Sequence, residues 1–423
     1  MTESHRRLVV VGQGYVGLPL AMRAVEVGFD VVGYDVDEPR VAKLAAGESY
    51  VEDVDSAELR AALAAGRYQA TTNADELAGF DIAVITVPTP LRETLPDLSH
   101  MEAAARTLAP ALKKGALVIL ESTTYPGTTE ELLVPLLAAG SGLKIGTDVL
   151  VGYSPERIDP GNTVWTFVTT PKVVSGINAA SLAAVDEFYS HLVTETVPVS
   201  TPKEAELCKL LENTFRHVNV ALVNELAMFA GELGIDVWEA IDAASTKPFG
   251  FMPFRPGPGV GGHCLPVDPS YLSWQVRRSL GESFRFVELA NDVNAHMPSY
   301  VVRRVSRALN DRERAVKGSR ILVLGLGYKR NTSDARESPS VNVALQLAGL
   351  GAQVRAADPH VDPSMALGLI ERVECTNEEL AAADAVVMLT NHDAFDVKAV
   401  AEHASYVLDC RRVVPAGDNV EYL

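Results

Sequence analysis

The sequence predicts an α/β protein with two Rossmann-like, doubly wound domains joined by a central helical section that contains one long helix. Three observations lead to this prediction. Short apolar runs alternate with helical patterns in the first half, a long helical pattern follows Thr201, and a second alternation begins near Arg320. A chain of 423 residues is also too long for a single hydrophobic core.

The first half, residues 1–200, is predicted to form a parallel sheet. Its runs are rich in Val and Ile and apolar throughout, which is typical of parallel strands covered on both faces. The helical segments between them make βαβ units. The expected strands are Leu8–Val11, Val31–Tyr34, Ile82–Val87, Leu117–Leu120 and Val149–Val151, with Lys172–Ser175 and Thr196–Val199 as extensions.

The middle, residues 201–310, is predicted to be helical. A helix should start at Thr201-Pro202-Lys203-Glu204, which has a capping-box pattern with Pro at the first helical position, and should run to about Gly234. Some 30 residues make a helix of about 45 Å, which can bridge two domains or bury a dimer interface. More helix is expected after Asp268, and the polar segment Asn310–Ser319 is a predicted linker.

The last part, residues 319–423, repeats the α/β pattern on a smaller scale. Four strands are expected, in the segments that begin at Arg320, Val354, Ala385 and Tyr406. This part is therefore predicted to be a second Rossmann-like domain.

Charge and cysteine usage exclude several classes of protein. A formal net charge of −18 argues against nucleic acid or an anionic membrane as partner, because both attract basic faces. No apolar run approaches the roughly 18 residues needed to span a bilayer, and no signal-peptide pattern is present. The cysteines, Cys208, Cys264, Cys375 and Cys410, form no CxxC pair and no zinc spacing. We therefore expect a cytoplasmic protein without a metal.

A glycine-rich loop follows the first predicted strand and opens a helix. Gly12 allows the tight turn, Gly14 lets the backbone approach a pyrophosphate, and Gly17 permits close packing of helix on strand. The next strand ends at Asp35, an acid suited to the adenosine ribose and unfavourable for a 2′-phosphate. NAD is therefore the predicted cofactor, with contacts from Gly12, Gly14, Tyr15, Val16, Gly17 and Asp35. Arg40 is either a further contact to the adenine or a phosphate, or a solvated helix residue.

A second loop, Gly325-Leu326-Gly327, also follows a predicted strand, but Arg330 occupies the third glycine position. A bulky side chain there would obstruct close packing of helix on strand. The next strand ends at Asp358, yet we predict no second NAD. Lys329 and Arg330 instead offer positive charge to a nucleotide phosphate, so this domain is predicted to bind the nucleotide half of a substrate.

One cysteine and one helix face are candidates for catalysis. Cys264 lies among glycines that allow a ligand close to the backbone, and a helix start just beyond it would lower its thiol pKa. On the long helix, Lys209, Asn213 and Arg216 stand at i, i+4 and i+7, hence on one face. An ammonium and an amide aimed at one point make an oxyanion site, although a solvated face has the same spacing.

Polar residues also follow three predicted strands of the first domain. They are Thr89 in a VPTP segment, Glu121–Thr124, and Ser154–Arg157. Ligands of doubly wound sheets lie beyond the carboxyl ends of the strands. These side chains are therefore candidates for holding a water or the nicotinamide, with ordinary turn chemistry as the alternative.

Taken together, the motifs resemble the UDP-glucose/GDP-mannose dehydrogenase family from end to end. The matching segments are GQGYVGLPLA, VPTP, ESTTYPGTTE, SPERIDPGN, EAELCKLLENTFRHVNVALVNELA, PGPGVGGHCLPVDP and GYKRNTSDARESPS. Several of them are similar to the branch that oxidises UDP-N-acetylhexosamines. UDP-glucose enzymes more often carry a lysine where this chain has Val267, before Asp268.

The resemblance implies a role for individual residues. Cys264 would be the covalent nucleophile. Lys209 and Asn213 would stabilise oxyanions, and Asp268, Thr123 and Glu156 would handle water and protons. The implied substrate contacts are Arg157, Ile158, Lys209, Asn213, Arg216, Arg255, Gly261, Tyr328, Lys329 and Arg411. Thr89, Thr123 and Arg336 would reach NAD, and the family is usually dimeric or larger through the long helix.

The resulting hypothesis is a four-electron oxidation of a sugar C6 hydroxymethyl to a carboxylate, with two NAD used in turn and a thiohemiacetal and a thioester on Cys264. UDP-GlcNAc is the preferred substrate, with UDP-ManNAc, UDP-glucose or GDP-mannose as alternatives. Two other functions stay open. One is a two-electron dehydrogenase of the β-hydroxyacid type, and the other is an NAD-sensing binding protein without turnover.

Overall fold

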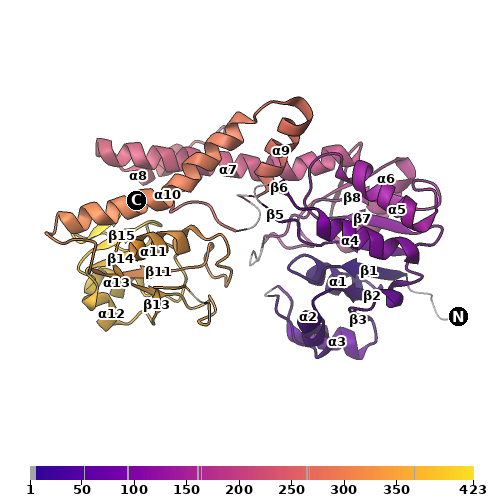
Figure 1. Ribbon diagram of the computed structural model, residues 1–423, viewed down its shortest axis with the longest axis horizontal. Helices are drawn as coiled ribbons and strands as arrows, with labels where there is room; N and C mark the ends of the chain where they lie inside the picture. The colour runs from indigo at the N-terminus through magenta and orange to yellow at the C-terminus, as the bar shows by residue number, and fades with distance from the viewer. Residues whose placement is uncertain are drawn as a thin grey trace. The chain divides into compact units, whose positions relative to one another are not determined.

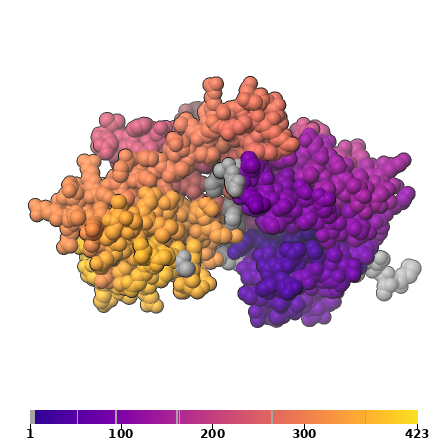
Figure 2. Space-filling view, in the orientation of Figure 1, coloured from indigo at the N-terminus to yellow at the C-terminus, as the bar shows by residue number. Residues whose placement is uncertain are grey.

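The computed structural model describes residues 6–51, 53–92, 95–159, 162, 164–262, 265, 267–365 and 367–423. The chain divides into two compact units. Unit 1 extends through Glu212 and also includes Ser270–Gly281, and unit 2 consists of Asn213–Pro269 and Glu282–Leu423. Figures 1 and 2 show unit 1 mainly in indigo to magenta and the C-terminal part of unit 2 in orange to yellow.

Unit 1 is built on one eight-stranded sheet with the order β10-β9-β8-β7-β4-β1-β2-β3. All neighbouring strands are parallel except β8 and β9, which pair antiparallel. The strands are β1 (Arg7–Val11), β2 (Asp30–Tyr34), β3 (Tyr68–Thr71), β4 (Ile82–Ile85), β7 (Leu117–Leu120), β8 (Leu150–Tyr153), β9 (Lys172–Gly176) and β10 (Thr196–Pro198). The predicted sheet is confirmed as parallel except at β9, and β3 is an additional edge strand that was not predicted.

Helices cover both faces of this sheet (Figure 1). Apolar side chains of α1, α3 and α6 pack against alternate residues of the central strands, such as Leu8 and Val10 of β1. α4 packs against α5. The helices are α1 (Gly17–Glu26), α2 (Glu38–Ala45), α3 (Ser56–Ala64), η1 (Ala74–Leu77), α4 (Ser99–Leu108), η2 (Ala109–Ala111), η3 (Thr129–Leu133), α5 (Val134–Ser141) and α6 (Ala179–Leu192). A small hairpin of β5 (Leu91–Arg92) and β6 (Leu95–Pro96) follows β4.

The long helix α7 (Pro202–Leu233) confirms the predicted element to within one residue at each end. At its start the Thr201 hydroxyl accepts a hydrogen bond from the Lys203 amide and donates to the Glu204 carboxylate. At its end Gly234 adopts the left-handed conformation with φ +69°, and the next amide, of Ile235, bonds back to the Ala230 carbonyl. The chain passes from unit 1 to unit 2 within this helix, after Glu212.

Unit 2 contains a six-stranded parallel sheet with the order β13-β12-β11-β14-β15-β16. The strands are β11 (Arg320–Leu324), β12 (Gln353–Ala357), β13 (Glu371–Arg372), β14 (Ala385–Met388), β15 (Val407–Asp409) and β16 (Val420–Tyr422). The expectation of four strands was wrong. β13 and β16 are the edge strands. Their segments are short and contain charged residues, so no apolar run predicts them.

The helices of unit 2 complete two layers around its sheet. α10 and α11 pack on one face, around Ile321 and Val323 of β11, whereas α12 and α13 pack on the other, around Leu322 and Leu324. The C-terminal half of α7 packs against α8 through the cluster that contains Val223. The helices of this unit are α8 (Val237–Ser245), α10 (Arg285–Asn310), α11 (Pro339–Gly349), α12 (Asn377–Ala382) and α13 (Val397–His403). α9 (Asp268–Leu280) begins where helix was expected.

The three glycines of the first loop differ in what a side chain would meet. Gly12 has φ +93°, and a Cβ there would lie 3.0 Å from the Thr86 carbonyl oxygen. A Cβ on Gly17 would lie 1.9 Å from the Gly12 carbonyl oxygen, which is backbone and cannot rotate away. A Cβ on Gly14 would meet no atom within 4 Å. The loop is therefore closed by protein at Gly12 and Gly17 and open at Gly14.

This difference predicts the outcome of two alanine substitutions. Gly17→Ala should lower the free energy of unfolding by about 1–3 kcal/mol, because the added methyl group forces the Gly12 turn to shift. Gly14→Ala is the matched control and should change stability by less than about 0.5 kcal/mol. Urea unfolding followed by circular dichroism measures both. Equal midpoints for Gly17→Ala and the unmodified protein would contradict the packing described here.

Candidate functional site

The acid at the end of β2 is held beside the first glycine loop. The Asp35 carboxylate accepts hydrogen bonds from the backbone amides of Gln13, at 2.8 Å, and Asp37, at 3.0 Å. Arg40 donates to the same carboxylate at 2.9 Å and lies over the ring of Tyr50. Arg40 is therefore not fully solvated. It lies beside the loop and partly neutralises the charge of Asp35.

The loop and its acid fit a dinucleotide. Open space at Gly14 lets a pyrophosphate approach the backbone near the start of α1, where unpaired amides and the helix dipole favour an anion. Asp35 still has lone-pair capacity beyond its three donors, since a carboxylate can accept about four hydrogen bonds. These residues match the chemistry of a ribose attached to a pyrophosphate.

Two predicted residues at the carboxyl ends of strands lie together. The Thr89 hydroxyl, after β4, donates to the Thr123 carbonyl, after β7, at 2.8 Å. Tyr271 of α9 donates to the Thr89 carbonyl at 2.7 Å. Ser122 donates to the Val87 carbonyl at 2.7 Å. The loops at this edge of the sheet are therefore joined by hydrogen bonds, and Thr89 and Thr123 lie next to each other.

Glu121, one of the candidates at the strand ends, is paired with a lysine. It is buried and forms an ion pair with Lys172, the first residue of β9. Lys172 also donates to the Pro155 carbonyl at 3.1 Å. Burial lowers the pKa of Lys172, and the nearby charge of Lys209 lowers it further. This pair was not predicted, and its one signal in the sequence is a lysine at the start of an otherwise apolar strand.

Lys209 and Glu156, both predicted to be catalytic, are in direct contact. The Lys209 ammonium donates to the Glu156 carboxylate at 3.0 Å and to the Glu156 carbonyl at 2.7 Å. Both side chains are largely buried. The loop that follows β8 is therefore held by two lysines, since Lys172 bonds the carbonyl of Pro155 and Lys209 that of Glu156.

The next residues of that loop also touch the long helix. The Arg157 guanidinium donates to the Pro171 carbonyl at 2.8 Å and forms an ion pair with Glu212 of α7. The Ile158 amide donates to the Glu156 carboxylate. Arg157 and Ile158, two predicted substrate contacts, are thus placed next to the Lys209–Glu156 pair within unit 1.

In unit 2 the structure brings three further predicted residues together. The Asn213 amide donates to the Asp268 carboxylate, and Arg216 donates to the Asn213 carbonyl oxygen. Asn213 and Asp268 are buried. Cys264, the predicted nucleophile, lies outside the described residues, as does His263.

The glycine-rich segment before Cys264 packs against the C-terminal Rossmann-like part of unit 2. A Cβ on Gly261 would lie 2.8 Å from the Cβ of Tyr328, and one on Gly257 would lie 2.8 Å from the Arg411 guanidinium. Arg411 is held by a 2.7 Å bond to the Leu389 carbonyl. Three predicted substrate contacts therefore lie together, because Tyr328 packs against Gly261 and Arg411 packs against Gly257 of the same segment, at positions where a Cβ would be crowded.

Two other predicted contacts of unit 2 form ion pairs with nearby acids. Arg255 is half exposed and forms an ion pair with Asp242 of α8. Arg336 is exposed and forms an ion pair with Asp334 at 2.7 Å.

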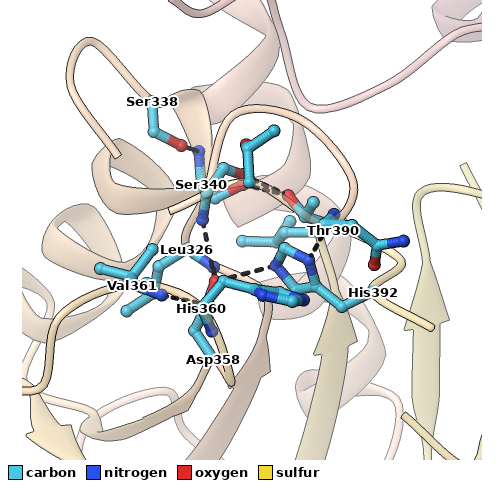
Figure 3. A network of polar contacts seen from close by, with 12 residues as sticks. Leu326, Ser338, Ser340, Asp358, His360, Val361, Thr390 and His392 are labelled. Carbon is cyan, nitrogen blue, oxygen red and sulfur yellow. Dashed lines mark hydrogen bonds and ion pairs between the residues drawn. The ribbon is translucent and has the colours of Figure 1, made fainter. Parts of the chain in front are cut away.

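The second glycine loop differs from the first at its acid. Gly325 has φ +87°, similar to Gly12. The Asp358 carboxylate accepts hydrogen bonds from four backbone amides and from His392 (Figure 3). Five donors leave it no capacity for a ribose. This occupancy gives a physical reason for expecting no second NAD.

Two searches for other site types are negative within the described part of the chain. Among those residues, no group of three His, Cys, Asp or Glu side chains has the geometry to hold a metal ion. No described helix is long and apolar enough to cross a membrane.

Family models match most of the chain in three consecutive segments. Residues 6–193 match the NAD binding domain of the UDP-glucose/GDP-mannose dehydrogenase family, residues 203–296 its central domain, and residues 322–416 its UDP binding domain. The matched segments agree with the two Rossmann-like parts and the helical section between them.

Individual relatives match over nearly their whole length. A UDP-N-acetyl-D-glucosamine 6-dehydrogenase of Pseudomonas aeruginosa is 39% identical over 92% of this chain and 91% of its own. A UDP-N-acetyl-D-mannosamine dehydrogenase of Pyrococcus horikoshii is 36% identical over 92% of this chain and 90% of its own. The solved structure of a UDP-D-ManNAc dehydrogenase from Pyrococcus horikoshii superimposes with a TM-score of 0.90 at 33% identity, covering 98% of each chain.

Proposed function

The chain belongs to the UDP-glucose/GDP-mannose dehydrogenase family and is an NAD-dependent nucleotide-sugar dehydrogenase, and from this premise we propose that it oxidises the C6 hydroxymethyl of a UDP-N-acetylhexosamine to the carboxylate. UDP-GlcNAc is our preferred substrate. The observation that carries the proposal is the pairing of both predicted proton-transfer carboxylates with predicted oxyanion donors. Glu156 contacts Lys209, and Asp268 contacts Asn213.

We assign NAD to the first glycine loop, with Gly12, Gly14, Tyr15, Val16 and Gly17 lining the pyrophosphate and Asp35 holding the ribose. Arg40, Thr89, Thr123 and Arg336 are the further proposed contacts. When bound, NAD accepts a hydride from the carbon that is oxidised, and two NAD used in turn complete the four-electron reaction. The overall change consumes one water and releases three protons with the two NADH.

The chain's own groups supply the acid–base chemistry. Glu156, Asp268 and Thr123 are proposed to take the C6 hydroxyl proton and to orient the hydrolytic water. Lys209 and Asn213 are proposed to stabilise the negative charge that develops on the C6 oxygen. They are buried, so their bonds to that oxygen act in a medium of low dielectric constant, where electrostatic stabilisation is strong.

Cys264 is proposed to hold the half-oxidised sugar. Its thiolate forms a bond to the aldehyde carbon, and the carbonyl oxygen takes up a proton to give a thiohemiacetal. Loss of the second hydride and of the hydroxyl proton leaves a thioester. Water then attacks the same carbon, the carbon–sulfur bond breaks, and the thiol and the carboxylate are released. A covalent adduct cannot escape while the coenzyme is exchanged.

We further propose three domains with distinct tasks. Residues 1–200 would bind NAD, residues 201–310 would carry the cysteine segment, and residues 319–423 would bind the UDP half. The proposed substrate contacts are Arg157, Ile158, Lys209, Asn213, Arg216, Arg255, Gly261, Tyr328, Lys329 and Arg411. The matches to NAD binding, central and UDP binding domains support this division.

The choice of sugar rests on two observations. The relatives named above act, by their names, on UDP-GlcNAc and UDP-ManNAc, and Val267 replaces the lysine that is more frequent in UDP-glucose enzymes. UDP-ManNAc and UDP-glucose are the alternatives. A two-electron dehydrogenase of the β-hydroxyacid type would need no cysteine in the position of Cys264.

A panel of nucleotide sugars tests the reaction and its stoichiometry. With UDP-GlcNAc limiting, we expect two NADH per sugar and a carboxylate product, measured by absorbance and mass spectrometry. UDP-ManNAc, UDP-GalNAc, UDP-glucose and GDP-mannose complete the panel, and preference is ranked by kcat/KM. One NADH per sugar would favour the two-electron alternative, and NAD binding without turnover of any sugar would contradict the proposal.

Substitution of the nucleophile tests the covalent route. Cys264→Ser should retain binding of NAD and of UDP-GlcNAc, because neither binding site depends on the thiol. It should form no uronic acid, because an alkoxide leaving group and a poor nucleophile replace the thiolate. Cys208→Ser is the matched control, since Cys208 is a half-buried thiol that the mechanism does not use. Full conversion to the uronic acid by Cys264→Ser would exclude the thioester mechanism.

We also propose a homodimer through α7. One face of this helix exposes apolar side chains at spacings of three, four and seven residues, as expected for a helix packed on a partner. Leu211, Leu222, Phe229 and Leu233 are each more than half exposed, and Leu207, Phe215 and Leu226 only slightly less. Such a row of large apolar side chains is rare on the surface of a monomer.

The double substitution Leu222→Glu with Phe229→Glu should convert the protein to a monomer, because it would bury four carboxylates across a two-fold interface. Sedimentation velocity measures the change in mass. Leu369→Glu is the control, because Leu369 is highly exposed but lies outside this row. A monomeric unmodified protein would refute the proposed dimer.

A further inference from the structure

A buried histidine after β14 connects the second glycine loop to its acid. The His392 Nε2 atom lies 2.9 Å from the Asp358 carboxylate, and both side chains are completely buried. The Asn331 amide donates to His392 Nδ1 at 2.9 Å. Figure 3 shows the imidazole of His392 directed at the end of β12, where Asp358 lies. His392 thus joins two segments of unit 2 through one ring.

These two bonds assign the tautomer of the ring. A backbone amide can only donate, so Nδ1 must carry the lone pair that accepts from Asn331. The remaining hydrogen is on Nε2, which donates to Asp358. Burial alone would raise the pKa of Asp358, but the bonds from His392 and from the backbone lower it well below its ordinary value. The carboxylate is therefore a fixed acceptor that orients the imidazole.

The next residue, Asp393, holds the same turn from its other side. The Asn331 side chain donates to the Asp393 carboxylate at 2.7 Å and accepts from the Asp393 amide at 2.9 Å. Arg330 donates to that carboxylate at 2.8 Å. Asn331 has φ +55°, a conformation unfavourable for most residues with a side chain. The turn is therefore kept in an uncommon conformation by several bonds to His392 and Asp393.

The turn held in this way leads directly from the proposed nucleotide contacts. Tyr328 and Lys329 immediately precede Arg330 and Asn331, and the Thr332 hydroxyl bonds the Lys329 carbonyl at 2.9 Å. The charge of Arg330 is neutralised by Asp393. Any rotation of Asn331 would move the backbone that carries Tyr328 and Lys329, because only Arg330 separates Lys329 from Asn331.

We propose that His392 is a positioning residue for UDP, which it does not touch but whose binding turn, Tyr328–Asn331, it holds in the binding conformation through Asn331. The inference rests on the proposed function, in which Tyr328 and Lys329 contact the nucleotide. A turn ordered before binding loses less conformational entropy when the ligand arrives, so the affinity for UDP is higher. In this domain Asp358, the acid that follows β12, accepts a hydrogen bond from His392 and does not bind a ribose.

Three substitutions at position 392 distinguish the effect of the bond to Asn331 from that of the bond to Asp358. His392→Ala removes both and should weaken UDP binding about tenfold, since the part-buried Asn331 amide loses its acceptor and the turn is no longer ordered before binding. His392→Asn keeps an acceptor near the place of Nδ1 and should bind within about threefold of the unmodified protein. His392→Gln reaches toward Asp358 but offers Asn331 no acceptor at that place, so it should resemble alanine. Calorimetric titration with UDP measures all three.

Control variants separate positioning from loss of the fold. His360→Ala is the matched control, because the His360 ring contacts the His392 ring at a tilted angle while its bond to Asp358 comes from the backbone amide, which alanine retains. NAD binding by the same samples reports whether unit 1 is intact. Asn331→Gly, at an exposed position, removes the side-chain bonds to Asp393 without changing charge and should also weaken UDP binding.

The outcomes distinguish a failure of the proposed function from a failure of the positioning role of His392. An unmodified protein that does not bind UDP would contradict the proposed function. The positioning role alone would be overturned if Asn331→Gly and either His392→Ala or His392→Gln, each as a single variant, bound UDP with normal affinity. In turnover assays, the proposal requires KM for the nucleotide sugar to rise while kcat changes little, whereas a general loss of folded protein would lower kcat and leave KM unchanged.

Discussion

Both sheets of this protein depend on a glycine that turns the chain back at the carboxyl end of their first strand. Gly12 and Gly325 have φ values of +93° and +87°, which side chains rarely adopt. A Cβ on Gly12 would lie 3.0 Å from the Thr86 carbonyl oxygen, and one on Gly325 would lie 2.3 Å from that of Thr390. Without these two turns, neither loop could direct its amides at the space beyond the sheet, where ligands of such folds bind.

From this shared turn the two loops diverge, and the residue at the third glycine position decides how. Gly17 allows α1 to begin immediately and to approach the Gly12 carbonyl closely. Arg330 prevents the same course, and the next helix, α11, begins only at Pro339. The longer connection provides the turn that His392 and Asp393 hold. One topology thus yields a compact loop in unit 1 and an extended one in unit 2.

The elements that could be predicted from the sequence are those specified by local pattern. Continuous apolar runs located β1, β4 and β7, and the Thr201 capping box located the start of α7. The strands of the two large sheets that were missed, β3, β13 and β16, are all edge strands that pair with a single neighbour. Propensity is a weak guide where pairing with the rest of a sheet decides.

The candidate site shows the same division. Loop glycines and the spacing of Lys209 and Asn213 could be recognised along the chain. The partners of buried charges could not, because Glu121 and Lys172 are 51 residues apart and Asp358 and His392 are 34 apart. A buried ion is tolerated only with a partner, and topology alone decides which residue meets it. Residues whose function is to hold another residue are therefore the least visible in a sequence.

The distribution of charge explains why such holding residues are needed. A chain with a net charge of −18 repels an anionic nucleotide sugar at long range, so its affinity must come from donors that are local and already in place. Each cation discussed for the site in unit 1 is fixed by protein oxygens, Lys172 by Glu121, Lys209 by Glu156 and Arg157 by Glu212. Such pairing weakens the electrostatic attraction of each cation for an anionic ligand. It also keeps these side chains in one geometry, so that in the proposed reaction the developing oxyanion would meet groups that need not reorganise.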